Sequence, residues 1–336
     1  MRLFLAPMEG VIDHHFRAIY SAIGGVDICV SEFVRVNELP VPEKIFLRDC
    51  PELRGEGSCV TPQGTPVRIQ LLGSNPHTIA QSAQTAAALG AAAIDLNFGC
   101  PAKTVNNSQG GSVLLKNPAL VAQIVRAVRD AVPDATPVTA KMRLGFEDRS
   151  LYLDNALAIA DAGANELCVH ARSRADGYNP PAYWHCIADI VDALDIPVVA
   201  NGEIWNLQDW QRCKAQSGCE DFMLGRGLVA CPDLALQIKA AAAGERYQAT
   251  GWDPVLALLY RFYLETKDAY PLRFLGNRVK QWLFYLQMHY PEAGKFFNRI
   301  KRYRQPHEFD RAFAAVGADS ANHAWHQSQY RKTTAG

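Results

Sequence analysis

The sequence has no long hydrophobic run, since no apolar stretch reaches the roughly 20 residues that a membrane-spanning helix needs. The apolar start runs into Pro7 and Glu9, so we expect no signal peptide. The 24 glycines among 336 residues are too few for a collagen repeat, and 49% hydrophobic residues are too many for a disordered chain. The sequence therefore predicts a globular cytoplasmic protein with no membrane partner.

Paired cysteine motifs are also missing. No two of the nine cysteines have C-x-x-C spacing, which argues against a zinc ribbon or an iron–sulfur cluster. An odd number of cysteines in a chain of this size favours free thiols in a reducing compartment. We therefore expect a protein with no metal and no disulfide framework.

The chain carries no net charge, with 34 Lys and Arg against 34 Asp and Glu. The two ends differ, however. Residues 1–244 carry 20 Lys and Arg against 26 Asp and Glu, and residues 245–336 carry 14 against 8. An acidic body joined to a basic segment indicates an anionic partner for the basic part. The alternative is an ordinary solvated helical face, and charge alone leaves both open.

Residues 1–244 alternate between short apolar runs and amphipathic, Ala-rich stretches. Eight apolar runs predict strands at 3–6, 28–30, 67–72, 93–96, 138–142, 166–170, 198–200 and 221–224. Helical periodicity predicts helices at 76–89, 118–131, 151–162, 184–194, 207–215 and 232–243. Strands that alternate with helices form parallel sheets.

Eight such units in about 244 residues are typical of a (β/α)8 TIM barrel, which belongs to the α/β class. A doubly wound open sheet is the alternative, but no G-x-G-x-x-G motif follows the first strand. After residue 244 the pattern is helical, at 254–270, 272–290, 292–303 and 307–316, with prolines between the segments. We predict a barrel domain at 1–244 and a small all-helical domain at 245–336, frayed over 317–336.

Cys100 stands at the end of a predicted strand, between Gly99 and Pro101. In a barrel the chemistry lies at the carboxyl ends of the strands. A thiol with its ordinary pKa of about 8.5 is protonated at neutral pH, so Cys100 can serve as a general acid. Cys168, within a strand, is expected to be a small buried hydrophobe.

Other polar residues at the strand ends fit a flat cofactor that carries a phosphate. Gln70 is an amide inside an apolar run, and Lys141 ends a core strand, where it needs an anionic partner. Glycine-rich loops after the last two strands are typical of phosphate sites in such barrels. The remaining candidates are Pro7, Met8, Glu9, His170, Asn201, Gly202, Glu203, Gly225 and Arg226. Flavin mononucleotide (FMN) fits this arrangement, with Lys141 beside the negative charge of the reduced ring.

Seven motifs occur in the order of the strands. They are APMEG (6–10), RIQLLG (68–73), LNFGCP (96–101), KMRLG (141–145), VHARS (169–173), ANGEI (200–204) and LGRG (224–227). Together they closely resemble the tRNA-dihydrouridine synthases. The basic helical segment is similar to the RNA-binding domain of that family, and residues 32–66 and 278–283 most resemble its C-type bacterial subfamily, which reduces uridine 16 of the D-loop.

The resemblance implies reduction of a tRNA uridine to 5,6-dihydrouridine, with NADPH as the reductant. Bound FMN would supply a hydride to C6 of the base and Cys100 a proton to C5, while the candidates named above hold FMN. Asn97 and Tyr178 would contact the target nucleotide, which must be splayed out of the folded RNA. Arg35, Arg278 and Lys280 would bind phosphates. We expect a monomer.

Two other functions remain open from the sequence. A flavin barrel that acts on a free pyrimidine would need no basic tail, and a tRNA-binding module without catalysis would bind no flavin. The binding mode of NADPH is not indicated, because the chain has no dinucleotide fingerprint.

Overall fold

The computed structural model describes residues 1–55 and 59–318. The chain divides into two compact units, Met1–Gly225 and Arg226–Gly336, and each is described by itself. The sequence placed the functional boundary at residue 244, so α9 (Arg226–Ala230) and α10 (Leu234–Ala243) fall in the second unit here. The domain assignment at 244 stays a prediction.

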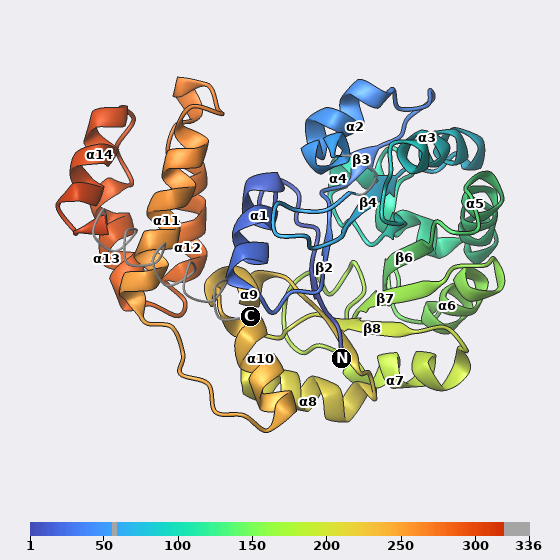
Figure 1. Ribbon diagram of the computed structural model, residues 1–336. Coiled ribbons are helices and arrows are strands. Elements are labelled where there is room, and N and C mark those ends of the chain that lie inside the picture. Colours follow the sequence, from blue (N-terminus) through green and yellow to red (C-terminus); the bar gives the residue numbers. More distant parts are fainter. Residues whose placement is uncertain (56–58, 319–336) are drawn as a thin grey trace. The chain divides into compact units, whose positions relative to one another are not determined.

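The first unit is a closed parallel barrel (Figure 1). Within the described residues its eight strands are β1 (Leu3–Leu5), β2 (Ile28–Val30), β4 (Val67–Leu72), β5 (Ile94–Phe98), β6 (Val138–Arg143), β7 (Glu166–His170), β8 (Val198–Asn201) and β9 (Asp221–Leu224). Each pairs in parallel with its neighbours, and the β2–β4 pairing closes the ring. The predicted TIM barrel and its eight strands are confirmed.

Helices surround this sheet. The sequence predicted five of them, which are α3 (Pro76–Ala88), α5 (Pro118–Ala131), α6 (Tyr152–Asp161), α7 (Trp184–Ala193) and α8 (Leu207–Ser217). It did not predict α1 (His14–Ile23). Asn75, Asn117 and Asn206 cap α3, α5 and α8, because each side-chain oxygen accepts a backbone N–H of the first turn. In α3 and α5 a proline occupies the first helical position, where its missing N–H costs nothing.

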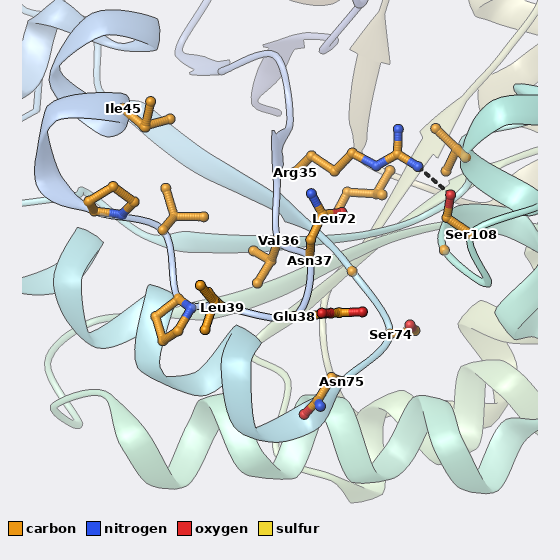
Figure 2. A pocket seen from close by; sticks show the side chains of 16 residues that line it. Arg35, Val36, Asn37, Glu38, Leu39, Ile45, Leu72, Ser74, Asn75 and Ser108 are labelled. Atoms are coloured by element: carbon orange, nitrogen blue, oxygen red, sulfur yellow. Dashed lines mark hydrogen bonds between the residues drawn. The ribbon is translucent and has the colours of Figure 1, made fainter.

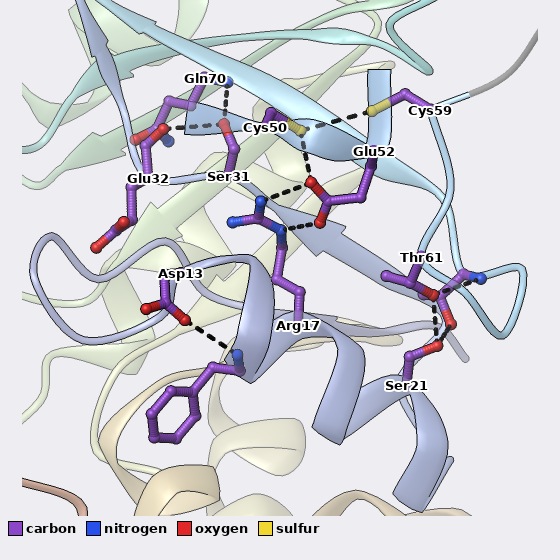
Figure 3. Close-up of polar contacts among 12 residues, drawn as sticks. Asp13, Arg17, Ser21, Ser31, Glu32, Cys50, Glu52, Cys59, Thr61 and Gln70 are labelled. Atoms are coloured by element: carbon purple, nitrogen blue, oxygen red, sulfur yellow. Dashed lines mark hydrogen bonds and ion pairs between the residues drawn. The ribbon is translucent and has the colours of Figure 1, made fainter. Parts of the chain in front are cut away.

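The segment from 32 to 66 connects β2 to β4 and is structured in part. It contains β3 (Val34–Arg35), α2 (Glu43–Asp49) and the 3-10 helix η1 (Pro51–Arg54). Arg17 of α1 and Glu52 of η1 form a buried ion pair, with Nε–Oε1 at 2.7 Å and Nη2–Oε2 at 2.9 Å (Figure 3). This ion pair links η1 to α1.

The interior of the barrel is apolar in the middle and charged at the amino ends of the strands. Phe4, Ala6, Val30, Cys168, Val199 and Met223 form one buried cluster. Below it Glu166 pairs with Arg2 at 2.8 Å and with Arg68 at 2.5 Å. Cys168 is a buried free thiol in the core, as predicted, and all nine cysteines of the chain are free.

The second unit is helical as far as it is described. After α9 and α10 come α11 (Trp252–Lys267), the 3-10 helix η3 (Leu272–Phe274), α12 (Asn277–Leu286), α13 (Pro291–Ile300) and α14 (Pro306–Ala314). Trp282 of α12 lies in the core of this unit. Its ring packs edge-on against the Phe262 ring, with the ring centres 5.4 Å apart. Its indole N–H donates to the Val229 carbonyl at 3.1 Å. The predicted helical domain is present, and residues 319–336 of the predicted frayed end lie outside the described residues.

Within the described part of the chain, every helix is too short or too polar to cross a bilayer.

Candidate active site at the carboxyl ends of the strands

Asn97, near the end of β5, builds the turn that carries Cys100. Its Oδ1 accepts hydrogen bonds from the backbone N–H groups of Gly99 and Cys100, both at 2.9 Å. The Cys100 carbonyl accepts from the N–H of Ser112 at 3.1 Å and from its hydroxyl at 2.9 Å. The backbone of the turn is therefore held on both sides, which fixes the point from which the thiol projects.

Gly111 lets the following loop approach this turn. Its φ is +66°, and a Cβ there would lie 2.8 Å from the Cys100 carbonyl oxygen. A side chain at this position would both strain the backbone and collide with the turn. The loop with α4 (Lys103–Asn106) and η2 (Gly111–Lys116) therefore packs directly against the Cys100 backbone.

Cys100 is the only one of the nine cysteines, all in the described residues, that is partly exposed. Burial raises the pKa of its thiol, and the negative charge of Glu9 raises it further, while Arg143 and Arg35 act in the opposite direction. A raised pKa keeps the thiol protonated at neutral pH. The group is suited to donate a proton rather than to attack as a thiolate.

Gln70 of β4 lies inside the barrel with its side chain fully buried. Its Nε2 donates to Asp95 at 2.6 Å, and its Oε1 accepts from Asn97 Nδ2 at 2.7 Å. Since a primary amide has two N–H groups and two lone pairs, one of each remains for a ligand. Asn97 thus joins the Cys100 turn to the Gln70 amide, a link that the sequence did not reveal.

Lys141 of β6 reaches across β7 to β8. Its Nζ donates to Asn201 Oδ1 at 3.1 Å, and Asn201 Nδ2 donates to the Met223 carbonyl at 2.8 Å. Burial lowers the pKa of the Lys141 ammonium. This ammonium makes one hydrogen bond among the described residues, so it keeps donors for a ligand with negative charge.

His170, at the end of β7, lies against Gly202. The φ of Gly202 is +111°, and a Cβ there would lie 2.6 Å from His170 Cδ2. Glu203 also has a positive φ, +61°, and its carboxylate pairs with Arg172 at 2.5 Å. Arg172 is fully buried, and its Nη1 has no hydrogen-bond partner among the residues that the structure describes. The sequence placed Arg172 in a motif but gave it no role.

Arg143, which sequence reasoning also missed, links the Cys100 turn to the loop that carries Tyr178. Its Nε donates to the Gly99 carbonyl at 3.0 Å, and its Nη1 donates to the Gly177 carbonyl at 2.9 Å. Its guanidinium lies 5.1 Å from the centre of the Tyr178 ring. That ring is 52% exposed and stands 6.1 Å from the His170 ring. An aromatic face is therefore held in the open beside the Cys100 turn.

Pro7, Met8 and Glu9 follow β1 in a tight turn, in which the Met8 carbonyl accepts from the N–H groups of Val11 and Ile12, both at 2.9 Å. Gly225 closes the first unit, and a Cβ there would lie 3.5 Å from Met8 Sδ. Arg226 comes next in the chain as the first residue of α9. The structure thus brings the β1 turn and the end of β9 together.

Arg35 is an exposed residue of β3. Its Nη2 donates to the Thr104 carbonyl at 3.1 Å and to the Ser108 hydroxyl at 2.7 Å. It lines a pocket of about 750 Å³ with residues of the loops after β3, β4 and β5 (Figure 2). Because Ser108 belongs to the loop that packs on Cys100, Arg35 lies on the Cys100 side of the barrel.

Arg278 and Lys280 lie on α12 of the second unit. Arg278 donates to Gln281 at 3.1 Å, and Lys280 donates to the Tyr303 carbonyl at 2.7 Å. Lys280 lines a pocket of about 870 Å³ that also contains four basic residues that the sequence did not single out. These are Arg273, Lys301, Arg302 and Arg304. Their segments are up to 31 residues apart in the sequence, so only the fold gathers them.

Residues 4–316 match the family model described as dihydrouridine synthase (Dus). The chain belongs to the dihydrouridine synthase family. It is accordingly an enzyme, an oxidoreductase, and the resemblance stated from its motifs is confirmed.

Two curated relatives cover nearly all of this dihydrouridine synthase. The tRNA-dihydrouridine(16) synthase of Shewanella oneidensis is 48% identical over 311 residues, which are 93% of this chain and 96% of the relative. The tRNA-dihydrouridine(16) synthase of Pseudomonas putida is 50% identical over 302 residues, 90% of this chain and 93% of the relative. Among solved structures, a 2-naphthoyl-CoA reductase complex has a TM-score of 0.53 at 14% identity, covering 73% of this chain and 50% of that one. That likeness shows the barrel fold alone.

Proposed function

We propose that this dihydrouridine synthase reduces uridine 16 of tRNA to 5,6-dihydrouridine, with FMN as its flavin and NADPH as reductant. The observation that carries the proposal is the Cys100 turn, whose backbone N–H groups donate to the Asn97 side chain that in turn donates to the Gln70 amide. The names of the two relatives support the choice of tRNA and of position 16.

The residues at the strand ends fit a flavin. Gln70 offers one N–H and one lone pair, which match the alternating acceptors and donors at the edge of the flavin ring. Lys141 offers a cation to the negative charge of a reduced ring. Gly202 leaves room for the His170 ring, because a Cβ at residue 202 would lie 2.6 Å from His170 Cδ2.

We assign the remaining cofactor contacts accordingly. The β1 turn with Pro7, Met8 and Glu9 supports the ring, and His170 and Asn201 complete its surroundings. The N–H groups of Gly202, Glu203 and Gly225 and the cation of Arg226 bind the phosphate, as backbone N–H groups and guanidinium groups do elsewhere. Bound FMN would supply the hydride chemistry at C6 of uracil, and these residues would hold and orient it.

Cys100 donates the proton to C5. Reduction of the C5–C6 double bond needs a hydride at one carbon and a proton at the other, so the enzyme must hold an acid beside the base. The raised pKa of Cys100 favours the protonated thiol at neutral pH. The Asn97 turn fixes its position, which is the main requirement for proton transfer.

The RNA contacts follow from exposure and charge. The Tyr178 ring, 52% exposed, offers a face on which the splayed uracil can stack. Asn97 is 9% exposed and its amide already bonds the Cys100 turn and Gln70, so its contact with the nucleotide stays a prediction. Arg35 binds phosphate near the barrel, and Arg278 and Lys280 bind phosphates on the helical unit, where the basic pocket adds four further cations.

Replacement of Cys100 by Ala tests the chemistry. We expect Cys100→Ala to bind FMN with an unchanged visible spectrum and to form no detectable dihydrouridine in unmodified tRNA. The control is Cys186→Ala in α7, a buried cysteine away from the strand ends, which should keep full activity. Full activity of Cys100→Ala would refute the assignment of the acid.

Substrate and position need separate measurements. NADPH oxidation should be faster with unmodified tRNA than with free uracil, and equal rates would favour a free-pyrimidine reductase instead. A colourless protein that binds tRNA would be a module without catalysis. In tRNA from a strain that lacks this gene, dihydrouridine should vanish at position 16 and persist elsewhere.

A further inference from the structure

A chain of hydrogen bonds crosses the barrel interior beneath the proposed flavin site. It begins at the N–H groups of Gly99 and Cys100, passes through Asn97 and Gln70, and ends at Asp95. The second oxygen of Asp95 accepts from the Thr139 hydroxyl at 2.7 Å. Gln70, Asp95 and Thr139 are in register on β4, β5 and β6, which is why their side chains meet.

Every hydrogen bond in this chain has a fixed direction. The backbone N–H groups can only donate, so Asn97 must turn its oxygen to them and its nitrogen to Gln70. Gln70 must then turn its oxygen to Asn97 and its nitrogen to Asp95. A carboxylate accepts with both oxygens, so Asp95 satisfies both Gln70 and Thr139.

Asp95 is a buried carboxylate that accepts these hydrogen bonds and whose charge also stabilises the charged form of the Lys141 ammonium. Asp95 is 3% exposed. Its carboxylate is hydrogen-bonded to Gln70 and is not bonded directly to the Cys100 turn. A carboxylate costs free energy when it is buried, and here burial raises the pKa of Asp95, against the bonds from Gln70 and Thr139 and the charges of Arg68 and Lys141. A neutral apolar side chain would fill the space at lower cost, so the acceptor itself has a use.

We propose that Asp95 is a positioning residue that, together with Asn97, fixes the direction of the Gln70 amide, and so decides which positions the amide offers to the flavin as donor and acceptor. In this direction the Gln70 nitrogen keeps one free N–H and the Gln70 oxygen keeps one free lone pair. The edge of a flavin ring can accept a hydrogen bond from this N–H and donate one to this lone pair. The inference rests on the proposed function, because Gln70 is there assigned to the flavin.

Exchanging the side chains of Asp95 and Asn97 tests the direction of the Gln70 amide. The exchange leaves the total side-chain volume and charge unchanged. In Asn97→Asp alone, residue 97 presents an acceptor to the Gln70 oxygen, and this repulsion should lower the thermal midpoint. In the double variant Asp95→Asn with Asn97→Asp, Gln70 can turn around and donate to residue 97 while it accepts from residue 95. At least half of the lost thermal stability should then return.

FMN binding then separates positioning from stability. In the double variant the Gln70 amide is reversed, so the dissociation constant of FMN, titrated into the apoprotein, should rise at least about tenfold and the visible bands of bound FMN should shift. Asp95→Asn alone keeps an acceptor for Gln70 and a donor for Thr139, and Asn97 still orients the Gln70 amide, so its FMN affinity should fall less than that of the double variant.

Two results would overturn the inference. If the double variant is no more stable than Asn97→Asp, Asp95 does not set the direction of the chain. If the double variant regains stability and also binds FMN with unchanged affinity and spectrum, the direction of Gln70 does not matter to the flavin. An original protein that fails to bind FMN would instead contradict the proposed function, and the stability comparison would still report on the chain of bonds.

Discussion

At the scale of single residues, Gly202 is a position where only glycine fits. Its φ of +111° strains any other residue, and a Cβ would lie 2.6 Å from the His170 ring. We expect Gly202→Ala to lower the free energy of unfolding by about 1–3 kcal/mol and to weaken FMN binding, because either the loop or the ring must move. Urea unfolding and FMN titration measure the two effects.

Gly218→Ala is the matched control for Gly202→Ala. Gly218 ends α8 with a φ of +67°, but nothing lies within 4 Å of the Cβ that alanine would add. It should therefore lose about 1 kcal/mol from backbone strain alone and leave FMN binding unchanged. Equal effects of the two variants on FMN binding would mean that the Gly202–His170 contact is irrelevant to the site.

The reactivity of Cys100 measures how its surroundings set its acidity. Since the other eight cysteines are buried, iodoacetamide should label Cys100 first in the folded apoprotein. Burial raises its pKa, so the labelling rate should rise with pH through a midpoint above that of an exposed cysteine. Peptide mass spectrometry over pH 7–11 follows the reaction.

Two variants should move that midpoint in opposite directions. Glu9→Gln removes a negative charge that raises the Cys100 pKa, so labelling at pH 8 should speed up by roughly twofold to threefold. Arg35→Gln removes a positive charge that lowers this pKa, so labelling should slow down. Changes of the same sign in both variants would show that packing, and not charge, controls the thiol.

Sequence position alone singled out Cys100, Gln70 and Lys141 as candidates, because strand ends of a barrel carry the chemistry, and their roles stay predictions. It missed Arg143, whose role depends on carbonyl groups up to 44 residues away in the chain. The roles of Arg172 and Asp95 likewise depend on partners contributed by other strands or loops. Residue type and local spacing do not encode such partnerships, so these roles emerge only with the fold.

At the scale of elements, the Arg17–Glu52 pair fastens η1 to α1 (Figure 3). Arg17 is fully buried, and a buried pair that loses one partner leaves an uncompensated charge. We expect Arg17→Met to lower the free energy of unfolding by about 3 kcal/mol, and the double variant with Glu52→Leu to recover much of that loss. The exposed pair Arg48–Asp49 is the control, since Arg48→Met should cost less than about 0.5 kcal/mol.

The same pair predicts an acid-sensitive stability. Burial alone would raise the pKa of Glu52, but the hydrogen bonds and charge of Arg17 outweigh burial and lower it. A lowered pKa in the folded state stabilises the protein above the unfolded pKa of about 4.3, and this contribution disappears as the pH falls further. Between pH 6 and pH 3, Arg17→Met should therefore lose less stability than the original protein, as urea titrations at each pH would show.

Elements with a strong period could be predicted, and short elements defined by distant contacts could not. The eight barrel strands and the capped helices α3, α5 and α8 carry their signals locally. β3 has two residues and exists through its pairing with Leu71 and Leu72 of β4. α2 has seven residues and no side-chain cap at its start, so only Pro42 and the acidic Glu43 mark where it begins.

At the scale of the whole molecule, the zero net charge conceals an acidic barrel segment and a basic helical segment. The helical unit gathers Arg273, Lys280, Lys301, Arg302 and Arg304 at one pocket, which concentrates positive charge beyond what the +6 balance of residues 245–336 indicates. Such a pocket attracts a polyanion and makes binding dependent on salt. The split of charge therefore agrees with a tRNA substrate.

We expect the double variant Lys280→Gln with Arg304→Gln to weaken tRNA binding and to reduce its salt dependence. Each lost phosphate contact should lower the slope of log K against log salt concentration by about 0.7–0.9. Lys214→Gln, which removes a lysine paired with Glu220 on the barrel, is the control and should change neither quantity. FMN binding should be unchanged in all variants, and loss of tRNA affinity without any change in the salt slope would mean that the pocket acts through folding and not through phosphate contacts.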